Sequence, residues 1–78
     1  MKFKVGDLII AQAHWSTGET LVEAIIVKRW QTDEHWSGDV IDNVHLYITF
    51  DATDPTAVND IDMVSRFRDS NWSLKNEA

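Results

Sequence analysis

The sequence predicts a small all-β domain, for three main reasons. A chain of 78 residues can bury one modest core. Its β-branched and aromatic residues lie in short runs, separated by polar segments that favour turns. Residues 44–50 also alternate strictly between two kinds of side chain. The even positions of this run are therefore expected to face the core: Val44, Leu46, Ile48 and Phe50.

Five strands are predicted along the chain. The first is residues 7–13, where a Gly-Asp pair opens an aliphatic run, and a polar stretch with one glycine then forms a loop. Residues 21–30 form the longest strand, with apolar residues at both parities, as in a strand partly covered on each face. Residues 44–50 are the third strand. Residues 56–58 and 62–67 are two short closing strands.

The last of these segments has a second interpretation. Asp54 and Pro55 are suited to cap and begin a helix in which apolar residues recur at a spacing of three. The domain would then be a three-stranded antiparallel sheet with a C-terminal helix at about residues 55–67. We favour the strands, because asparagine, aspartate and serine, which are weak helix formers, crowd the same window.

The remaining segments are polar. Residues 31–43 have no hydrophobic period, so we predict a long loop there. Residues 1–68 are expected to form a single domain, and residues 69–78 a tail that Trp72 pins to it. The longest apolar runs have four residues, far fewer than a membrane span needs, and we expect a cytoplasmic protein without a membrane partner.

The distribution of charge is lopsided. The net charge is −6, and no lysine or arginine lies between Trp30 and Ser65. Such a surface repels a phosphate backbone, so direct nucleic-acid binding is not expected, whereas a basic partner would be attracted. The base-free stretch holds eight acidic residues: Asp33, Glu34, Asp39, Asp42, Asp51, Asp54, Asp60 and Asp62.

Several segments resemble one branch of a known fold. Residues 3–11 read Phe-Lys-Val-Gly-Asp-Leu-Ile-Ile-Ala, residues 23–27 Glu-Ala-Ile-Ile-Val, residues 47–51 Tyr-Ile-Thr-Phe-Asp and residues 58–61 Val-Asn-Asp-Ile. Together they are similar to the Tudor and Agenet branch of the Src-homology-3-like small β-barrels. The resemblance implies that residues 1–68 form a five-stranded barrel of this type.

The resemblance also implies a kind of site. Tudor-like domains bind methylated lysine or arginine in an aromatic cage through cation–π attraction. The cage would draw on Trp15 in the loop after the first strand, and on Phe50 and Tyr47 in the third strand. Asp51 and Asp54, in the following turn, would pair with the cation.

The motifs of the common enzyme classes are missing from the sequence. The chain has no cysteine, no G-x-S-x-G motif and no glycine-rich phosphate loop. His14, His35 and His45 do not have the spacing of a metal site. We therefore expect no enzymatic activity, no metal and no cofactor.

Two functional hypotheses follow. The first is a non-enzymatic binding module that docks a basic segment of a protein partner. Its binding residues would be Trp15, Tyr47, Phe50, Asp51, Asp54 and Trp36. An acidic face would add Asp33, Glu34, Asp39, Asp42, Asp60 and Asp62. The alternative is a small phage or mobile-element inhibitor whose acids imitate nucleic-acid charge and block a DNA- or RNA-binding protein. The alternative predicts that the acids form one stripe. Homodimerisation through an exposed strand edge is compatible with both hypotheses.

Overall fold

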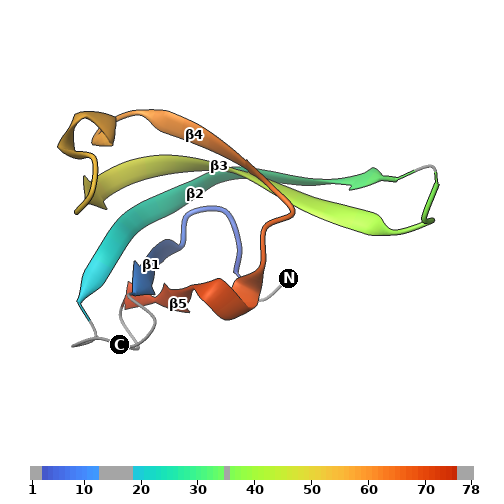
Figure 1. The fold of residues 1–78 in the computed structure, drawn as a ribbon, viewed down its shortest axis with the longest axis horizontal. Coiled ribbons are helices and arrows are strands. Elements are labelled where there is room, and N and C mark those ends of the chain that lie inside the picture. The colour runs from blue at the N-terminus through green and yellow to red at the C-terminus, as the bar shows by residue number, and fades with distance from the viewer. Residues whose placement is uncertain (1–2, 13–18, 35, 76–78) are drawn as a thin grey trace.

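The computed structural model describes residues 3–12, 19–34 and 36–75. Its strands are β1 (Leu8–Gln12), β2 (Thr20–Asp33), β3 (Val40–Asp51), β4 (Ile61–Ser65) and β5 (Ser73–Leu74). Two short 3-10 turns, η1 (Pro55–Ala57) and η2 (Asp69–Asn71), lie before and after β4. All five strands belong to one antiparallel sheet in the order β4-β3-β2-β1-β5 (Figure 1). The predicted all-β class is confirmed, and the sheet has five strands as expected. The fifth is β5, which lies in the segment predicted to be a tail, and not at residues 56–58.

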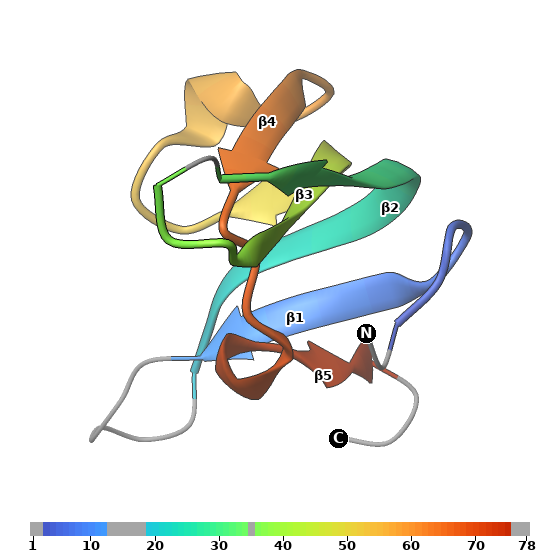
Figure 2. The ribbon, with the colours of Figure 1, turned by 90° about the vertical axis from the view of Figure 1, so that its right-hand side faces the viewer.

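The sheet is curved but open, so the predicted closed barrel is wrong. A barrel closes only when its two edge strands pair with each other. Here β4 and β5 are the two edges, and β3, β2 and β1 lie between them (Figure 2). β5 has only two residues, which pair with Ile9 and Ile10 of β1. β5 does not pair with β4, so the gap between the two edges stays open.

Both predictions for the segment after β3 need correction. No strand forms at residues 56–58, because Thr56 and Ala57 belong to η1 and Val58 caps it. Pro55 stands at the start of η1, and the Asp54 carboxylate accepts a hydrogen bond from the Thr56 N–H (3.2 Å). The alternative helix over residues 55–67 is also wrong, since residues 61–65 pair with β3. Asn59 takes a left-handed conformation (φ 73°), which turns the chain into β4.

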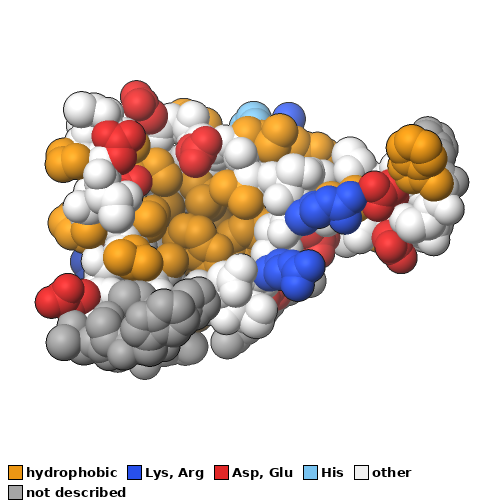
Figure 3. All heavy atoms as spheres, viewed as in Figure 1, with side chains coloured by type: hydrophobic (Ala, Val, Ile, Leu, Met, Phe, Trp, Pro, Cys, Tyr) orange, Lys and Arg blue, Asp and Glu red, His pale blue; other side chains and the backbone are white. Residues whose placement is uncertain are grey.

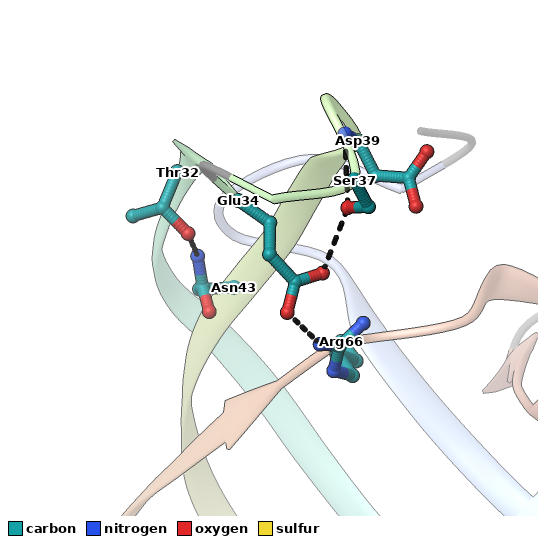
Figure 4. A network of polar contacts seen from close by, with 6 residues as sticks. All are labelled: Thr32, Glu34, Ser37, Asp39, Asn43 and Arg66. Carbon is teal, nitrogen blue, oxygen red and sulfur yellow. Dashed lines mark hydrogen bonds and ion pairs between the residues drawn. The ribbon is translucent and has the colours of Figure 1, made fainter.

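The predicted long loop at residues 31–43 is largely a hairpin. β2 continues to Asp33 and β3 begins at Val40, and these two residues pair with each other. This end of the hairpin, residues 31–34 and 36–42, projects beyond the rest of the sheet, and we call it the arm (Figure 1). The Glu34 carboxylate joins the arm to the residue after β4 through an ion pair with Arg66 (2.7 Å), and it also accepts from the Ser37 hydroxyl (3.2 Å; Figure 4).

The core lies on the inner, concave face of the sheet. Alternate residues of β2 and β3 point there, as their periodicity predicts. One expected member is absent: a bulge at Thr49 shifts the register, so Phe50 pairs with Glu23 and is 45% exposed. The prediction that Phe50 faces the core is therefore wrong. The buried core residues are Phe3, Ile9, Ala24, Ile26, Val44, Leu46, Ile48 and Phe67.

The end of the chain packs against this core. Trp72 is partly buried and its ring stacks on Phe67 at 5.8 Å between centroids. Phe67 in turn contacts Phe3 edge to face at 6.5 Å. Two consecutive aromatic contacts therefore attach the segment that carries β5. Among the described residues, neither helical turn has the length or apolar character of a membrane-spanning helix.

A carboxylate joins β2, β3 and the tail, and this arrangement predicts a pH effect. The Glu23 carboxylate lies 2.7 Å from the Lys75 ammonium and accepts a hydrogen bond from the Thr49 hydroxyl (2.8 Å). Both lower the pKa of Glu23, and Lys75 has the larger effect. A lowered pKa in the folded state means that the ionised form stabilises the fold above the ordinary glutamate value of about 4.3. This contribution is lost as the pH falls through the folded-state pKa.

We therefore expect Glu23→Gln to lower the free energy of unfolding by about 0.5–1 kcal/mol at pH 7, the upper part of the range for such pairs. The difference from wild type should shrink as the pH falls from 5 towards 2. Urea unfolding of both proteins at several pH values measures it. A difference that does not change with pH would contradict the role given to the ionised carboxylate.

Candidate functional site

A groove lies on the inner face of the open sheet, between β4 and the segment that precedes β5. Its volume is about 410 Å³, within the usual range of ligand sites, about 300–1,000 Å³. The surface view shows it as an apolar area with acidic side chains at its upper left (Figure 3). The floor consists of apolar residues from three strands: Val22, Leu46, Ile48 and Val64. Trp72, just before β5, forms the wall opposite β4, and Ala57 and Ile61 lie at the side.

The rim of the groove carries four carboxylates. The bulge at Thr49 turns Asp51 to the inner face, where it pairs with Val22 across the strands. Asp54 precedes η1. Asp60 directly precedes β4, and Asp62 is its second residue and pairs with Leu46 of the floor. None of the described residues that line the groove is a lysine or an arginine.

The carboxylates of Asp51 and Asp54 also hold the turn after β3. Asp51 accepts hydrogen bonds from the Asp54 N–H, the Thr53 hydroxyl and the Thr53 N–H, each at 3.0 Å. These donors, the Asp54 N–H above all, hold the pKa of Asp51 below its usual range. Asp54 accepts from both the N–H and the hydroxyl of Thr56. The hydrogen bonds therefore favour the ionised form of Asp51 and hold both carboxylates in position.

Unlike Asp51 and Asp54, the carboxylates of Asp60 and Asp62 are not held by hydrogen bonds from other described residues. Both residues are exposed, and within the described part of the chain neither carboxylate has a hydrogen-bond or ion-pair partner. Two negative charges beside an apolar floor, with no internal cation to neutralise them, can attract a cation from outside. They can also be substituted without removing a contact that holds the fold.

The residues predicted for the aromatic cage do not meet in the described structure. Asp51 and Asp54 share the groove. Tyr47 lies on the opposite face of β3, between two groove residues, and its hydroxyl donates to Asn59 Oδ1 (2.7 Å). Phe50 is on that outer face as well. Trp15 falls outside the described residues.

Trp36 lies at the end of the arm and is 93% exposed. The end of the arm lies at the opposite end of the sheet from the turn after β3, which borders the groove (Figure 1). An indole displayed in this way can anchor a partner, but it does not belong to the groove. His14 and His35 fall outside the described residues, and His45 packs edge to face on Trp30 at 4.9 Å. The described residues hold no cluster of three potential metal ligands.

The acidic residues form two separate groups. Asp33, Glu34, Asp39 and Asp42 lie on the arm, and Asp51, Asp54, Asp60 and Asp62 surround the groove. Basic side chains lie between the groove and the arm (Figure 3), where Arg66 and Arg68 line a shallow hollow beside Asp39 and Asp42. The charge-mimic hypothesis expects a single stripe, and the structure has two groups instead.

Sequence reasoning missed the floor of the groove. Val22, Leu46, Ile48 and Val64 have the pattern of core residues, and nothing local distinguishes a covered core residue from one beside an open edge. The missing information is that β4 and β5 do not pair. The rim did have a signal in the sequence, namely the stretch without lysine or arginine.

Comparison with protein-family models, with curated proteins and with solved structures finds no match.

Proposed function

We propose that the protein is a non-enzymatic docking module and that its groove binds a basic segment of a partner protein. The observation that carries this proposal is the combination of an apolar floor with four rim carboxylates and no cation among the described lining residues. A segment with both apolar and basic side chains satisfies both parts of such a site. A nucleic acid would not satisfy the charged part, because the rim carboxylates repel its phosphates.

The proposal retains the cation-binding character that the Tudor-like resemblance implies. It assigns the binding to the groove on the inner face and not to an aromatic cage. Cation–π capture would need converging rings, whereas Tyr47 and Phe50 lie on the face away from the carboxylates. In the groove, the recognition of charge falls to Asp60 and Asp62, and the burial of apolar side chains to the floor. The ligand class is therefore an apolar and basic peptide, with or without methylation.

A designed peptide tests the proposal. The probe is a capped peptide with the order Thr-Val-Ile-Lys-Val-Lys-Thr, and calorimetry measures its dissociation constant. We expect the double variant Asp60→Asn, Asp62→Asn to bind it about tenfold more weakly, which is about 0.7 kcal/mol for each carboxylate. The loss should be smaller at high salt, where exposed charges are screened.

The arm provides the matched control. Asp33→Asn with Asp39→Asn removes the same two charges, and within the described residues neither carboxylate has a partner. We expect this variant to bind the probe within about twofold of wild type. Asp33 pairs with Val40, six residues along β3 from Leu46, which pairs with Asp62. At about 3.3 Å per residue this is about 20 Å, more than one Debye length of about 8–10 Å. Equal losses in the two variants would mean that only net charge attracts the peptide, and the proposal would fail.

A further inference from the structure

We infer that the basic segment binds as an added strand, antiparallel to β4, so that its backbone pairs with the free edge of the sheet while its side chains enter the groove. This inference rests on the proposed function and specifies how the same site recognises its ligand. It also defines a sequence pattern for the ligand. The reason is that β4 is both a wall of the groove and an edge of the sheet.

The hydrogen-bond pattern shows which backbone groups of β4 are available. In an antiparallel pair, residues alternate between those that bond to the neighbouring strand and those whose N–H and C=O point away. Ile48 donates its N–H to the Asp60 carbonyl (3.0 Å). The backbone N–H and C=O groups of the even-numbered residues of β4 therefore point towards β3. The backbone groups of Ile61, Met63 and Ser65 therefore point outwards, and no strand of the described chain pairs with them.

The side chains of β4 determine what such a strand would carry. Asp62 and Val64 pair with Leu46 and Val44, so they face inwards, and Met63 faces the outer side beside His45. Directly opposed side chains on adjacent strands are in contact. An added strand would therefore place an apolar residue opposite Val64 and basic residues opposite Asp62 and Asp60.

Read from its N-terminus, the favoured segment is apolar, any residue, basic, any residue, basic. The intervening positions lie on the outer face, next to Ile61 and Met63, which are 55% and 56% exposed. Apolar residues there would cover these two side chains. The probe peptide has this pattern, with its third residue opposite Met63.

A second copy of the chain fits this edge less well than a basic segment. Each copy has a net charge of −6. Pairing β4 with β4 would also bring two sets of rim carboxylates together at one edge without a lysine or arginine in either described rim. Like charges brought together oppose association. Charge complementarity thus selects a basic strand from another protein.

The first test changes the protein. Met63→Pro removes one outward N–H that the fold does not use, and proline is tolerated in edge strands at such positions. Met63→Ala removes the same side chain but keeps the N–H. We expect the proline variant to bind the probe at least about tenfold more weakly than the alanine variant, because a ladder hydrogen bond and the adjoining contacts are lost.

The second test changes only the peptide, so it is independent of the folding of the proline variant. N-methylation of the third residue removes a donor that would bond to β4, whereas N-methylation of the fourth residue alters a group that points away. We expect a loss of at least about tenfold for the first peptide and less than about twofold for the second.

The outcomes separate the two proposals. If both tests leave affinity unchanged while Asp60→Asn with Asp62→Asn weakens it, the groove binds basic segments but strand addition is wrong. If neither set of changes matters, both proposals are wrong. If sedimentation shows that the wild type is a dimer, that Met63→Pro is a monomer and that the probe does not bind, a second copy occupies the edge and this inference is overturned.

Discussion

Ile26→Ala is expected to lower the free energy of unfolding by about 2–5 kcal/mol, the range for deleting buried aliphatic side chains. Ile26 is fully buried in the central strand β2. Its backbone also bonds to the segment before β1: its carbonyl accepts from the Gly6 N–H (2.8 Å) and its N–H donates to the Asp7 carbonyl (3.1 Å). These backbone bonds hold the strand in place, so the packing has little freedom to collapse into the space left by the missing side chain.

The loss is large relative to the total stability. A domain of this length is expected to have a stability of about 4–12 kcal/mol, and each kcal/mol changes its melting temperature by about 4–8 °C. Thermal unfolding followed by circular dichroism should therefore show a decrease of at least about 8 °C. Ile26→Val is the control, with an expected cost of about 0.5–1.5 kcal/mol. If the alanine and valine variants lose the same amount, the site is not tightly packed.

Ile26 is also useful because it does not line the groove. A variant destabilised at this position should, while still folded, bind the probe peptide as wild type does. Asp60→Asn with Asp62→Asn should instead keep the stability of wild type and weaken the binding of the probe. The reason is that those carboxylates have no partner in the described fold. Together the two variants separate the stability of the sheet from the recognition of the ligand.

The fold class was predictable because the central strands have a local signal. In β3, residues 44–48 alternate between buried and partly exposed positions, and the alternation is visible in the sequence. The arm has no such signal. Both of its faces are largely exposed, so Thr32, Asp33 and Val40 follow no hydrophobic period although they lie in paired strands. A hairpin without a buried face reads as a loop.

Other errors came from the effect of single residues or from the pairing of whole strands. The bulge at Thr49 reverses the faces of Phe50 and Asp51, and a strict alternation gives no warning of it. Thr56 has strand propensity, but the cap at Asp54 and the fixed φ of Pro55 favour a 3-10 turn. Closure of a barrel depends on whether the edge strands β4 and β5 pair with each other, and the residues of neither strand report this.

The candidate site was predictable in its charge and not in its shape. The base-free stretch identified the carboxylates of the rim. The groove exists because β4 and β5 remain unpaired, which no local pattern reports. Asp60 and Asp62 thus appeared as part of a general acidic face, while the structure places them with Asp51 and Asp54 around one apolar floor.

Phe67→Ala is expected to have an effect of similar size, about 3–5 kcal/mol, for a different reason. Phe67 is 5% exposed and stands between Phe3 and Trp72, so it connects the strands to the last segment of the chain. Its removal leaves a cavity and deprives the Trp72 ring of the surface on which it stacks. The backbone amides of β5 should then exchange with solvent faster, in addition to the global loss of stability.

Phe67→Leu is the matched control, because it keeps most of the apolar volume and loses the ring. We expect it to cost less than half as much as Phe67→Ala and to protect β5 better against exchange. The comparison bears on the groove, since Trp72 forms its wall opposite β4. If Phe67→Ala stays within about 1 kcal/mol of wild type, below the cost of a buried ring, the tail packs loosely. In that case the groove lacks a fixed second wall, and strand addition at β4 would have to provide the recognition through the edge and the carboxylates alone.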